Sequence, residues 1–247
     1  MKISIITVVF NGVATIKHCI DSVLGQNFDS IEYIIIDGNS TDGTREVIDS
    51  YGNRIDVFLS EPDKGIYDAM NKGIRLATGD LIGILNADDF YASDTVVSEI
   101  AQQVLKTGAD GCYGDLNYVD SIDEALITRK WISGDYKPNS FLLGWMPPHP
   151  TFFLKKECYN KFGDFRLDMG SAADYELMLR MIYKHGIRLA YVPKVIVKMR
   201  TGGVSNSTLK NRLEANKNDR KAWKTNGLKP WFFTLWLKPV RKIIQFI

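Results

Sequence analysis

A short apolar segment that ends in acids constrains the fold of this chain more than any other: Leu81-Ile82-Gly83-Ile84-Leu85, followed by Asn86-Ala87-Asp88-Asp89. An apolar run without polar alternation is typical of a strand covered on both faces, as in a parallel sheet. Because ligands of open α/β sheets bind outside the carboxyl ends of the strands, Asp88 and Asp89 are expected to face a ligand. A divalent ion that joins them to ligand phosphates would offset their mutual repulsion. Alternatively, the two acids cap a helix that begins near Ser93-Asp94.

The composition is that of an ordinary globular protein. The chain has 247 residues, 45% of them hydrophobic and 24% charged. One elaborated α/β domain or two small ones can therefore bury a sizeable core. Three cysteines and three histidines are scattered without CxxC spacing, which argues against a zinc site or a disulfide framework and suits a reducing cytoplasm. The N-terminus is typical of a first strand rather than a signal peptide, and no run is long enough to span a bilayer.

The charge is unevenly distributed along the chain. Residues 209–247 contain ten Lys or Arg and two acids, which gives this segment a net charge of +8. Because the whole chain has a net charge of +2, residues 1–208 carry −6. A protein that binds nucleic acid needs its basic face on the folded domain. The acidic body therefore argues against nucleic acid as the main partner.

The first hundred residues alternate strand and helix patterns, which predicts a parallel sheet. Strands are expected over 3–10, 31–36, 55–59 and 81–85, and helices over 14–24, after a loop and helix start at 38–44, and over 66–76. Three of these strands end at a polar residue, Asn11, Asp37 or Asn86, and polar groups that converge on one sheet edge form a ligand crevice. No GxGxxG follows the first strand, and no P-loop or GxSxG motif occurs. Bound phosphates would therefore be held by a metal ion and side chains.

Four ordered blocks resemble family 2 glycosyltransferases of the GT-A fold, the inverting enzymes that build bacterial surface polysaccharides. The blocks are Ser4-Ile5-Ile6-Thr7-Val8-Val9-Phe10-Asn11, Ile36-Asp37-Gly38-Asn39-Ser40-Thr41-Asp42-Gly43-Thr44, Asn71-Lys72-Gly73-Ile74 with Ala77 and Gly79-Asp80, and Leu85-Asn86-Ala87-Asp88-Asp89. They cover most of residues 3–90. The resemblance implies an α/β, GT-A-like fold with a mostly parallel central sheet flanked by helices.

In such enzymes the end of the first strand and the acid after the second strand cradle the nucleotide base. The resemblance implies that role for Thr7, Asn11 and Asp37. An ionised carboxylate only accepts hydrogen bonds and complements an imide N–H, so uridine fits better than cytidine. The alternative for Asp37 is that it caps its own loop. Val8 replaces the usual Pro of the first block, and Gly38 replaces the second acid of the second block.

The last block also departs from the family pattern. Asn86 stands where the first acid of the common form lies. An amide can bond a ribose but is a weaker metal ligand than a carboxylate. The binding of Mn²⁺ or Mg²⁺ is therefore expected to rest on Asp88, Asp89 or both.

The third block implies that Asn71 contributes to donor binding. The Arg that often precedes this Asn is replaced by Met70, which removes a phosphate contact. Lys64 or Lys72 is expected to supply that charge, unless these side chains are simply solvated.

A weaker fifth block, residues 172–177, stands where the family places its catalytic base. Asp174 lies in the first turn of a helix expected to run to His185, and a helix N-terminus stabilises an ionised carboxylate. Glu176 is the rival, but two helical positions point about 200° apart, so only one acid faces the site. Asp174 is favoured because family members carry an acid there.

Aromatic residues dominate two later segments. Trp131, Trp145 and His149, the last within a proline run, are typical either of a sugar pocket or of a core, and core packing is favoured. The 200–205 loop either closes over a nucleotide or reverses the chain. Residues 209–224 predict a charged helix, and the 231–237 aromatics beside basic residues predict either an interfacial helix on an anionic membrane or core docking.

We predict a single catalytic domain over residues 1–208, with a nucleotide-sugar half (about 1–107) and an acceptor half (108–208), followed by a basic aromatic tail (209–247). The expected activity moves a hexose from a nucleotide diphosphate sugar, with UDP favoured, to a lipid-linked or oligosaccharide acceptor. The expected setting is O-antigen, lipopolysaccharide or exopolysaccharide synthesis in the cytoplasm, with residues 228–247 at the inner face of the plasma membrane. The alternatives are a metal-dependent nucleotidyltransferase acting on a sugar phosphate and a non-catalytic nucleotide-sugar-binding protein.

Overall fold

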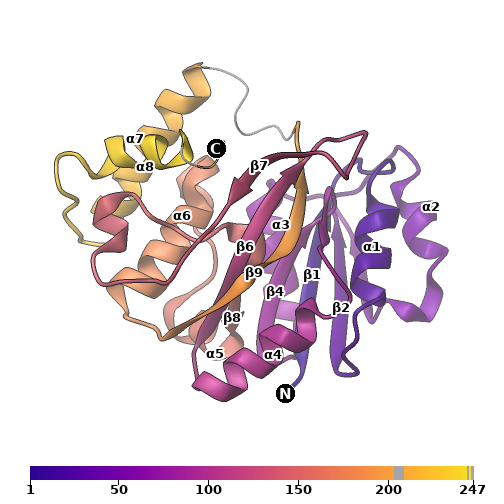
Figure 1. Cartoon of the computed structure of the whole chain (residues 1–247). Coiled ribbons are helices and arrows are strands. Elements are labelled where there is room, and N and C mark those ends of the chain that lie inside the picture. The colour runs from indigo at the N-terminus through magenta and orange to yellow at the C-terminus, as the bar shows by residue number, and fades with distance from the viewer. Residues whose placement is uncertain (203–208, 244, 246–247) are drawn as a thin grey trace.

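The fold is that of a computed structural model, which describes residues 1–202, 209–243 and 245 (Figure 1). The N-terminal half contains β1 (Ile3–Val9), α1 (Ile16–Leu24), β2 (Ile31–Asp37), α2 (Thr44–Asp49), the 3₁₀ helix η1 (Gly52–Arg54), β3 (Val57–Ser60), α3 (Ile66–Leu76), β4 (Leu81–Asn86), β5 (Asp89–Tyr91) and α4 (Val96–Thr107). The predicted alternation of strands and helices is therefore confirmed. Of the predicted 200–205 loop, residues 203–205 lie outside the described residues.

The second half continues the sheet and adds helices around it. Its elements are β6 (Gly111–Val119), β7 (Ile127–Trp131), the 3₁₀ helices η2 (Ser140–Leu143) and η3 (His149–Thr151), β8 (Phe153–Lys155), α5 (Lys156–Phe162), the 3₁₀ helix η4 (Leu167–Ala172), α6 (Ala173–Met178), the π-helix η5 (Leu179–Lys184), β9 (Leu189–Arg200), α7 (Leu209–Thr225) and α8 (Thr234–Ile243). The helix expected from Asp174 to His185 thus exists as α6 and η5 in succession.

One mixed sheet organises the chain, with the strand order β3-β2-β1-β4-β8-β6-β9-β5 and β7 paired to β6. Strands β1 to β4 pair in parallel, and β6 pairs in parallel with β9. Strand β8 is antiparallel to both β4 and β6, so β6 and β9 run in the same direction as the N-terminal strands. The prediction of a mostly parallel α/β sheet is confirmed.

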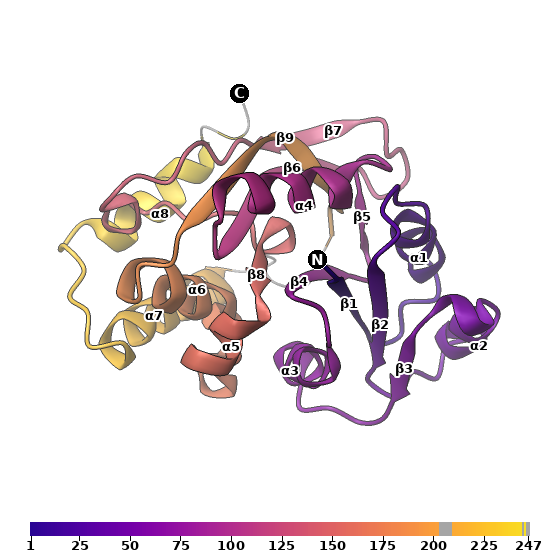
Figure 2. The ribbon, with the colours of Figure 1, turned by 90° about the horizontal axis from the view of Figure 1, so that it is seen from below.

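Helices cover both faces of this sheet because its strands are apolar on both sides. All seven residues of β1 are buried, and β4 is buried from Leu81 to Leu85. Helices α1, α2 and α4 cover one face, and α3, α5, α6 and α7 cover the other (Figure 2). The polar ends of β1, β2, β3 and β4 therefore meet at one edge of the sheet, where β9 also ends.

The acids after β4 do not cap the next helix. Asp88 lies in a tight turn, and Asp89 begins β5, which pairs with β9. Helix α4 starts only at Val96, after Thr95, so the capping alternative fails on position alone. The turn holds both acids at the sheet edge.

The C-terminal helices belong to the same core as the acceptor half. Trp223 of α7 is 1% exposed and its indole N–H donates to the Tyr175 hydroxyl at 2.8 Å. Leu235 of α8 is buried, and the Thr234 hydroxyl donates to the Leu142 carbonyl at 2.7 Å. The predicted boundary at residue 208 therefore does not separate two cores. Within the described residues, no helix has the length and apolar character needed to cross a bilayer.

Candidate functional site

The loop after β1 is held against the loop after β2 by hydrogen bonds. The backbone N–H of Asn11 donates to the Ser40 hydroxyl at 2.7 Å, and the Asn11 side-chain oxygen accepts from the Thr41 N–H at 2.9 Å. Asn11 is exposed just after the end of β1 and has a positive φ of 50°. The structure thus places Asn11 at the sheet edge, as predicted.

Asp37 closes its own loop. Its carboxylate is fully buried and accepts hydrogen bonds from the Ser40 N–H, the Ser40 hydroxyl and the Ser60 hydroxyl. These bonds fasten the ends of β2 and β3 together. The loop-capping interpretation of Asp37 therefore describes its contacts in this structure, and its position is at the predicted edge.

Two predicted donor-binding residues point into the protein. Thr7 is fully buried, and its hydroxyl contacts the Tyr33 hydroxyl at 3.1 Å. Both ends of the Asn71 carboxamide are bonded at 2.9 Å to the backbone of Phe165, which ties α3 to the segment before η4. The polar groups of Thr7 and Asn71 are therefore engaged in hydrogen bonds within the protein.

Asp63 is a site residue that the sequence patterns did not single out. Its carboxylate lies over Gly38: a Cβ on Gly38 would be 2.6 Å from Asp63 Oδ2 and 3.3 Å from the exposed ring of Phe10. Gly38 is therefore needed for this approach, and Asp63 places an acid beside the position where the family pattern has one. In the sequence, the only pattern that points to Asp63 is the run of turn-forming residues that follows β3.

Of the two lysines considered for phosphate binding, one is already engaged. Lys72 pairs with Glu61 at 2.8 Å and donates to the Pro62 carbonyl at 2.8 Å. Lys64 is exposed in the loop that follows β3 and forms no ion pair with a described acid. The structure therefore favours Lys64 as the available charge.

The acidic turn contains buried side-chain oxygens that a cation could contact. Asn86 donates to Asp89 Oδ2 at 3.1 Å. Two buried side-chain oxygens nevertheless have no hydrogen-bond partner in the described part of the chain, Asn86 Oδ1 and Asp89 Oδ1. Burial, and then the charge of Asp88, raise the pKa of Asp89 well above its ordinary value. Buried unpaired oxygens beside a second carboxylate are what a cation would satisfy.

These oxygens fit a divalent ion that shares its ligands with a bound anion. Oxygen donors are what Mg²⁺ and similar hard ions take, commonly one or two carboxylates together with substrate phosphates. Among the described residues, no group of three or more His, Cys, Asp or Glu side chains is placed to hold a metal ion. The residues Asn86, Asp88 and Asp89 would therefore form a partial shell that a diphosphate completes.

Arg200, the last residue of β9, contacts the backbone of the acidic turn. Its guanidinium donates to the Asp88 carbonyl at 2.6 Å and to Glu124, and it stands 4.8 Å from the ring centroid of Phe90. Its charge opposes the rise in the pKa of Asp89. His18 of α1 completes the cluster by stacking on Phe90 at 4.2 Å. The cluster ties the turn to α1, β9 and the β6–β7 hairpin.

Asp174 lies at the start of α6, half-buried, across from the acidic turn. Its negative charge acts on the pKa of Tyr67, His149 and Tyr118, so these side chains lie around it. Burial lowers the pKa of His149, so this imidazole is neutral at pH 7. Burial raises the pKa of Tyr118, and the charges of Asp89 and Asp174 raise it further, so both acids lie within electrostatic reach of this side chain.

Glu176, the rival acid, is committed to the core. It is fully buried, its two oxygens accept from Arg180 at 3.0 and 3.1 Å, and Asn226 of α7 donates to it at 3.0 Å. Arg180 in turn caps the backbone carbonyls of residues 162–164. Glu176 therefore holds α6, α5 and α7 together. The two tryptophans predicted to pack in the core differ in burial. Trp145 is buried and donates to the Ser133 carbonyl at 2.8 Å, whereas Trp131 is half-buried.

A mixed sheet of this order, with acids at the carboxyl edge of its parallel strands, defines the class of GT-A transferases. TarS 1-349 of S. aureus in complex with UDP-GlcNAc superposes with a TM-score of 0.72 at 15% identity, covering 96% of this chain and 69% of that TarS chain. The mannosyltransferase PcManGT from Pyrobaculum calidifontis, in complex with GDP-Man and Mn²⁺, gives 0.66 at 16% identity and covers 96% and 72%. At these identities the likeness establishes the fold.

Sequence comparison establishes the family. The profile described as Glycosyl transferase family 2 matches residues 4–166. An uncharacterised glycosyltransferase of Mycobacterium tuberculosis (strain ATCC 25618 / H37Rv) is 34% identical over 182 residues, which cover 72% of this chain and 68% of the relative. The chain belongs to glycosyl transferase family 2 and is a nucleotide-sugar-dependent glycosyltransferase.

Proposed function

We propose that this enzyme transfers a hexose, with inversion, from a UDP-sugar to a hydroxyl of a lipid-linked glycan during synthesis of a bacterial surface polysaccharide such as O-antigen or exopolysaccharide. The reaction takes place at the cytoplasmic face of the membrane. The observation that carries the proposal is the presence of two acidic groups: the turn with Asp88 and Asp89, where buried oxygens have no partner among the described residues, and Asp174, whose charge raises the pKa of Tyr118 as that of Asp89 does. One group suits a diphosphate with its counterion, and the other suits a nucleophile.

The donor lies along the carboxyl edge of the parallel strands. Asn11, Asp37 and Asp63 surround the position of the base, and a carboxylate there complements the imide N–H of uracil. Lys64 is the exposed charge available for the phosphates. The fold likeness to TarS, solved with UDP-GlcNAc, supports a UDP-sugar.

Transfer proceeds in a single displacement in which Asp174 is the base. Its carboxylate takes the proton of the acceptor hydroxyl as that oxygen bonds to the anomeric carbon from the face opposite the diphosphate. The bond from this carbon to the diphosphate oxygen breaks, and its electron pair leaves with UDP. A divalent ion held by Asp88 and Asp89 would stabilise the charge on the departing diphosphate. PcManGT, solved with Mn²⁺, supports this requirement.

Donor binding and product analysis test the proposal. With Mn²⁺ present, a UDP-sugar at about 100 times its dissociation constant should stabilise the protein by about 2.7 kcal/mol, a shift of several degrees in the unfolding midpoint. Turnover should release UDP and give a product of inverted anomeric configuration in the NMR spectrum. Release of pyrophosphate would instead indicate a nucleotidyltransferase, and absence of stabilisation by any UDP- or GDP-sugar would refute nucleotide-sugar binding.

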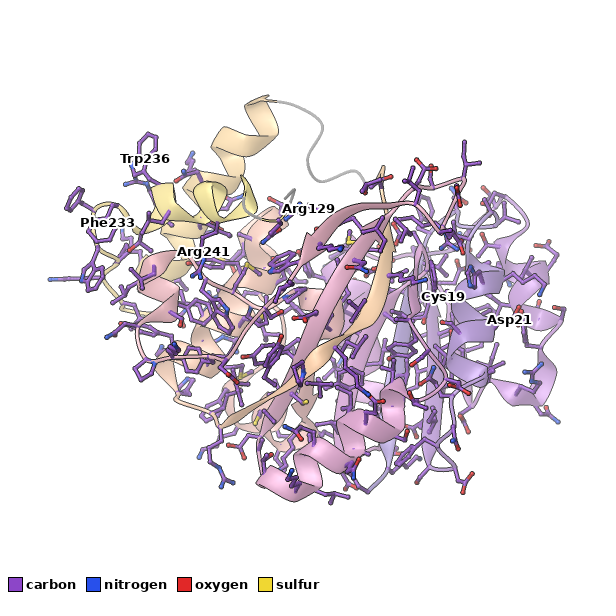
Figure 3. The ribbon with its side chains drawn as sticks, viewed as in Figure 1. Cys19, Asp21, Arg129, Phe233, Trp236 and Arg241 are labelled. Carbon is purple, nitrogen blue, oxygen red and sulfur yellow. The ribbon has the colours of Figure 1, made fainter. Side chains whose placement is uncertain are left out.

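The membrane contact is assigned to exposed aromatics on the C-terminal segment. Phe232 is 89% exposed and Trp236 66% exposed, and Trp231 is also exposed. Trp236 and Phe233 lie at the periphery of this segment (Figure 3). Arg241 and Lys229 supply nearby positive charge, each worth about 1 kcal/mol close to an anionic surface. The tail thus contains both kinds of residue: Trp236 is exposed and can contact a membrane, whereas Trp223 is buried in the core.

Removing two of these aromatics should detach the enzyme from membranes without unfolding it. Full burial of one such side chain is worth about 1.5–3 kcal/mol, so Phe232→Ser with Trp236→Ser should weaken binding to phosphatidylglycerol vesicles at least about tenfold. The matched control is Leu105→Ser with Ile122→Ser, two exposed apolar residues outside the tail. Vesicle flotation and the unfolding midpoint measure the outcome. Equal losses in both pairs would contradict a specific membrane face.

A further inference from the structure

A cavity of about 210 Å³ lies under α8, apart from the donor edge. Strand β7 and the segment after it line the cavity through Lys130, Trp131 and Ser133, and Trp145, which donates to the Ser133 carbonyl, also lines it. Helix α8 forms the roof through Lys238 and Arg241. The volume is far larger than a single water requires. The cavity can therefore hold a group of several heavy atoms.

Close packing at Gly144 fixes α8 over this cavity. A Cβ on Gly144 would lie 2.5 Å from the backbone nitrogen of Lys238, and the φ of Gly144 is 74°. The Lys238 ammonium then pairs with Asp219 at 2.7 Å and stands 3.8 Å from the ring centroid of Tyr175. The roof is thus held in place by the residues that surround it.

The lining of the cavity is cationic. Among the described residues that form it, Lys130, Lys238 and Arg241 are positively charged and none is acidic. Lys130 and Arg241 are exposed and form no ion pair with a described acid, whereas Lys238 is paired. Two cations without an ion-pair partner among the described residues, in a lining that includes two tryptophans, complement an anion that is attached to an apolar or planar group.

The cavity lies between the exposed aromatics of the tail and the catalytic region. Arg129 stands over the rings of Tyr118 and Trp131, at 4.5 and 5.5 Å from their centroids, and its Nε donates to Gln245 at 2.8 Å. Trp131 and Gln245 line the cavity. In Figure 3, Arg241 lies on α8 of the tail, and Arg129 lies on β7 at the side of the sheet next to the tail. A chain of contacts thus joins the cavity to Tyr118 on β6.

We propose that this cavity binds the phosphate or diphosphate of a lipid-linked acceptor, with Lys130 and Arg241 as the anion ligands. The inference rests on the proposed function, since it assumes a lipid-linked acceptor. Bound there, the acceptor phosphate lies beside the membrane-facing aromatics, and the attached sugar extends past Tyr118 toward Asp174. The cavity then selects acceptors that carry an anionic lipid end.

Binding of farnesyl diphosphate, a short prenyl diphosphate, tests the site. The intact enzyme should bind it with a change in tryptophan fluorescence, because Trp131 and Trp145 line the cavity. Lys130→Gln with Arg241→Gln should weaken this binding about tenfold for each charge lost. The control pair, Lys229→Gln with Arg220→Gln, removes two exposed charges of the same tail and should leave the affinity within about twofold. Arg241→Gln alone repeats the test if the double variant does not fold.

The outcomes distinguish the possible sources of the anion and the two proposals. Phosphatidylglycerol vesicles should lose affinity equally with both pairs of variants, and a selective loss in the cavity pair would assign the cavity to bilayer lipid and overturn the inference. Inorganic phosphate should bind far more weakly than farnesyl diphosphate, and equal affinity would also overturn it. UDP binding, measured by calorimetry, should be unchanged in every variant. If UDP binds but farnesyl diphosphate ignores the cavity charges, only this inference fails; if UDP does not bind, the proposed function fails.

Discussion

Asp89→Asn should give a protein that is more stable than the wild type and almost inactive. The Asp89 carboxylate is buried beside Asp88 with one oxygen unpartnered, and its pKa is raised by burial and by that neighbour. Asn removes the buried charge, so the free protein should gain about 1 kcal/mol at pH 7. Loss of the ion that stabilises the leaving diphosphate should cost several kcal/mol in the transition state, or at least about a thousandfold in turnover.

The pH dependence of stability provides an independent readout for Asp89. An acid whose folded-state pKa is raised favours the neutral form, so its contribution to stability is present below the unfolded-state pKa of about 3.9. That contribution is lost as the pH rises from there through the raised folded-state pKa. Urea unfolding of the free enzyme should therefore show a decline above about pH 4 that Asp89→Asn lacks.

Ligand addition should reverse the order of stability. Mn²⁺ with UDP should stabilise the wild type and leave the Asp89→Asn variant nearly unchanged, because the partial shell of oxygens is incomplete in the variant. Thermal unfolding with and without both ligands measures this. Full turnover of wild-type enzyme in excess EDTA, or equal stabilisation of the two proteins, would contradict a metal role for this turn.

Asp174→Asn should abolish transfer and leave donor affinity nearly unchanged. A general base contributes about 10²- to 10⁴-fold, and we propose that Asp174 acts on the acceptor hydroxyl rather than on the nucleotide. Transfer should therefore fall by that factor while the calorimetric dissociation constant for UDP stays within about twofold. A variant with near-normal transfer would assign the proton to another group around Tyr67 and His149.

Glu176→Gln is the contrasting control, two residues away. Glu176 is buried between Arg180 and Asn226, so breaking its ion pair should destabilise the fold by about 3 kcal/mol or more. Transfer per folded molecule should remain close to that of the wild type. The two variants thus separate a chemical role from a structural one by different readouts.

Much of the fold was predictable because the relevant signals are local. The apolar run from Leu81 to Leu85 and the polar residues at strand ends report burial and exposure along single elements, and the sheet edge follows from parallel pairing. The same logic placed Asn11, Asp37, Asn86, Asp88 and Asp89 on one edge. The sequence patterns did not reveal that Thr7 and Asn71 turn inward, because the direction of a side chain depends on the neighbours that surround it.

Contacts between distant residues required the tertiary structure. Arg200 reaches the Asp88 carbonyl across 112 positions, Asp63 lies over Gly38, and Glu176 meets Asn226. The sequence pattern around a residue indicates whether that residue is buried or exposed. It does not indicate which distant residue it contacts. The tail is the clearest case, because Trp223 and Trp236 are alike in sequence, yet one is buried against Tyr175 and the other is 66% exposed.

The sequence by itself determined the architecture, the polar sheet edge, the two acidic positions and the family, because burial patterns and motif residues are properties of single segments. Long-range packing shows that Glu176 is bonded within the core, that Lys72 is paired with Glu61, and that a cationic cavity forms under α8. Those outcomes depend on which surfaces pack against each other, and packing between elements far apart in the chain is settled by their combined shape and charge.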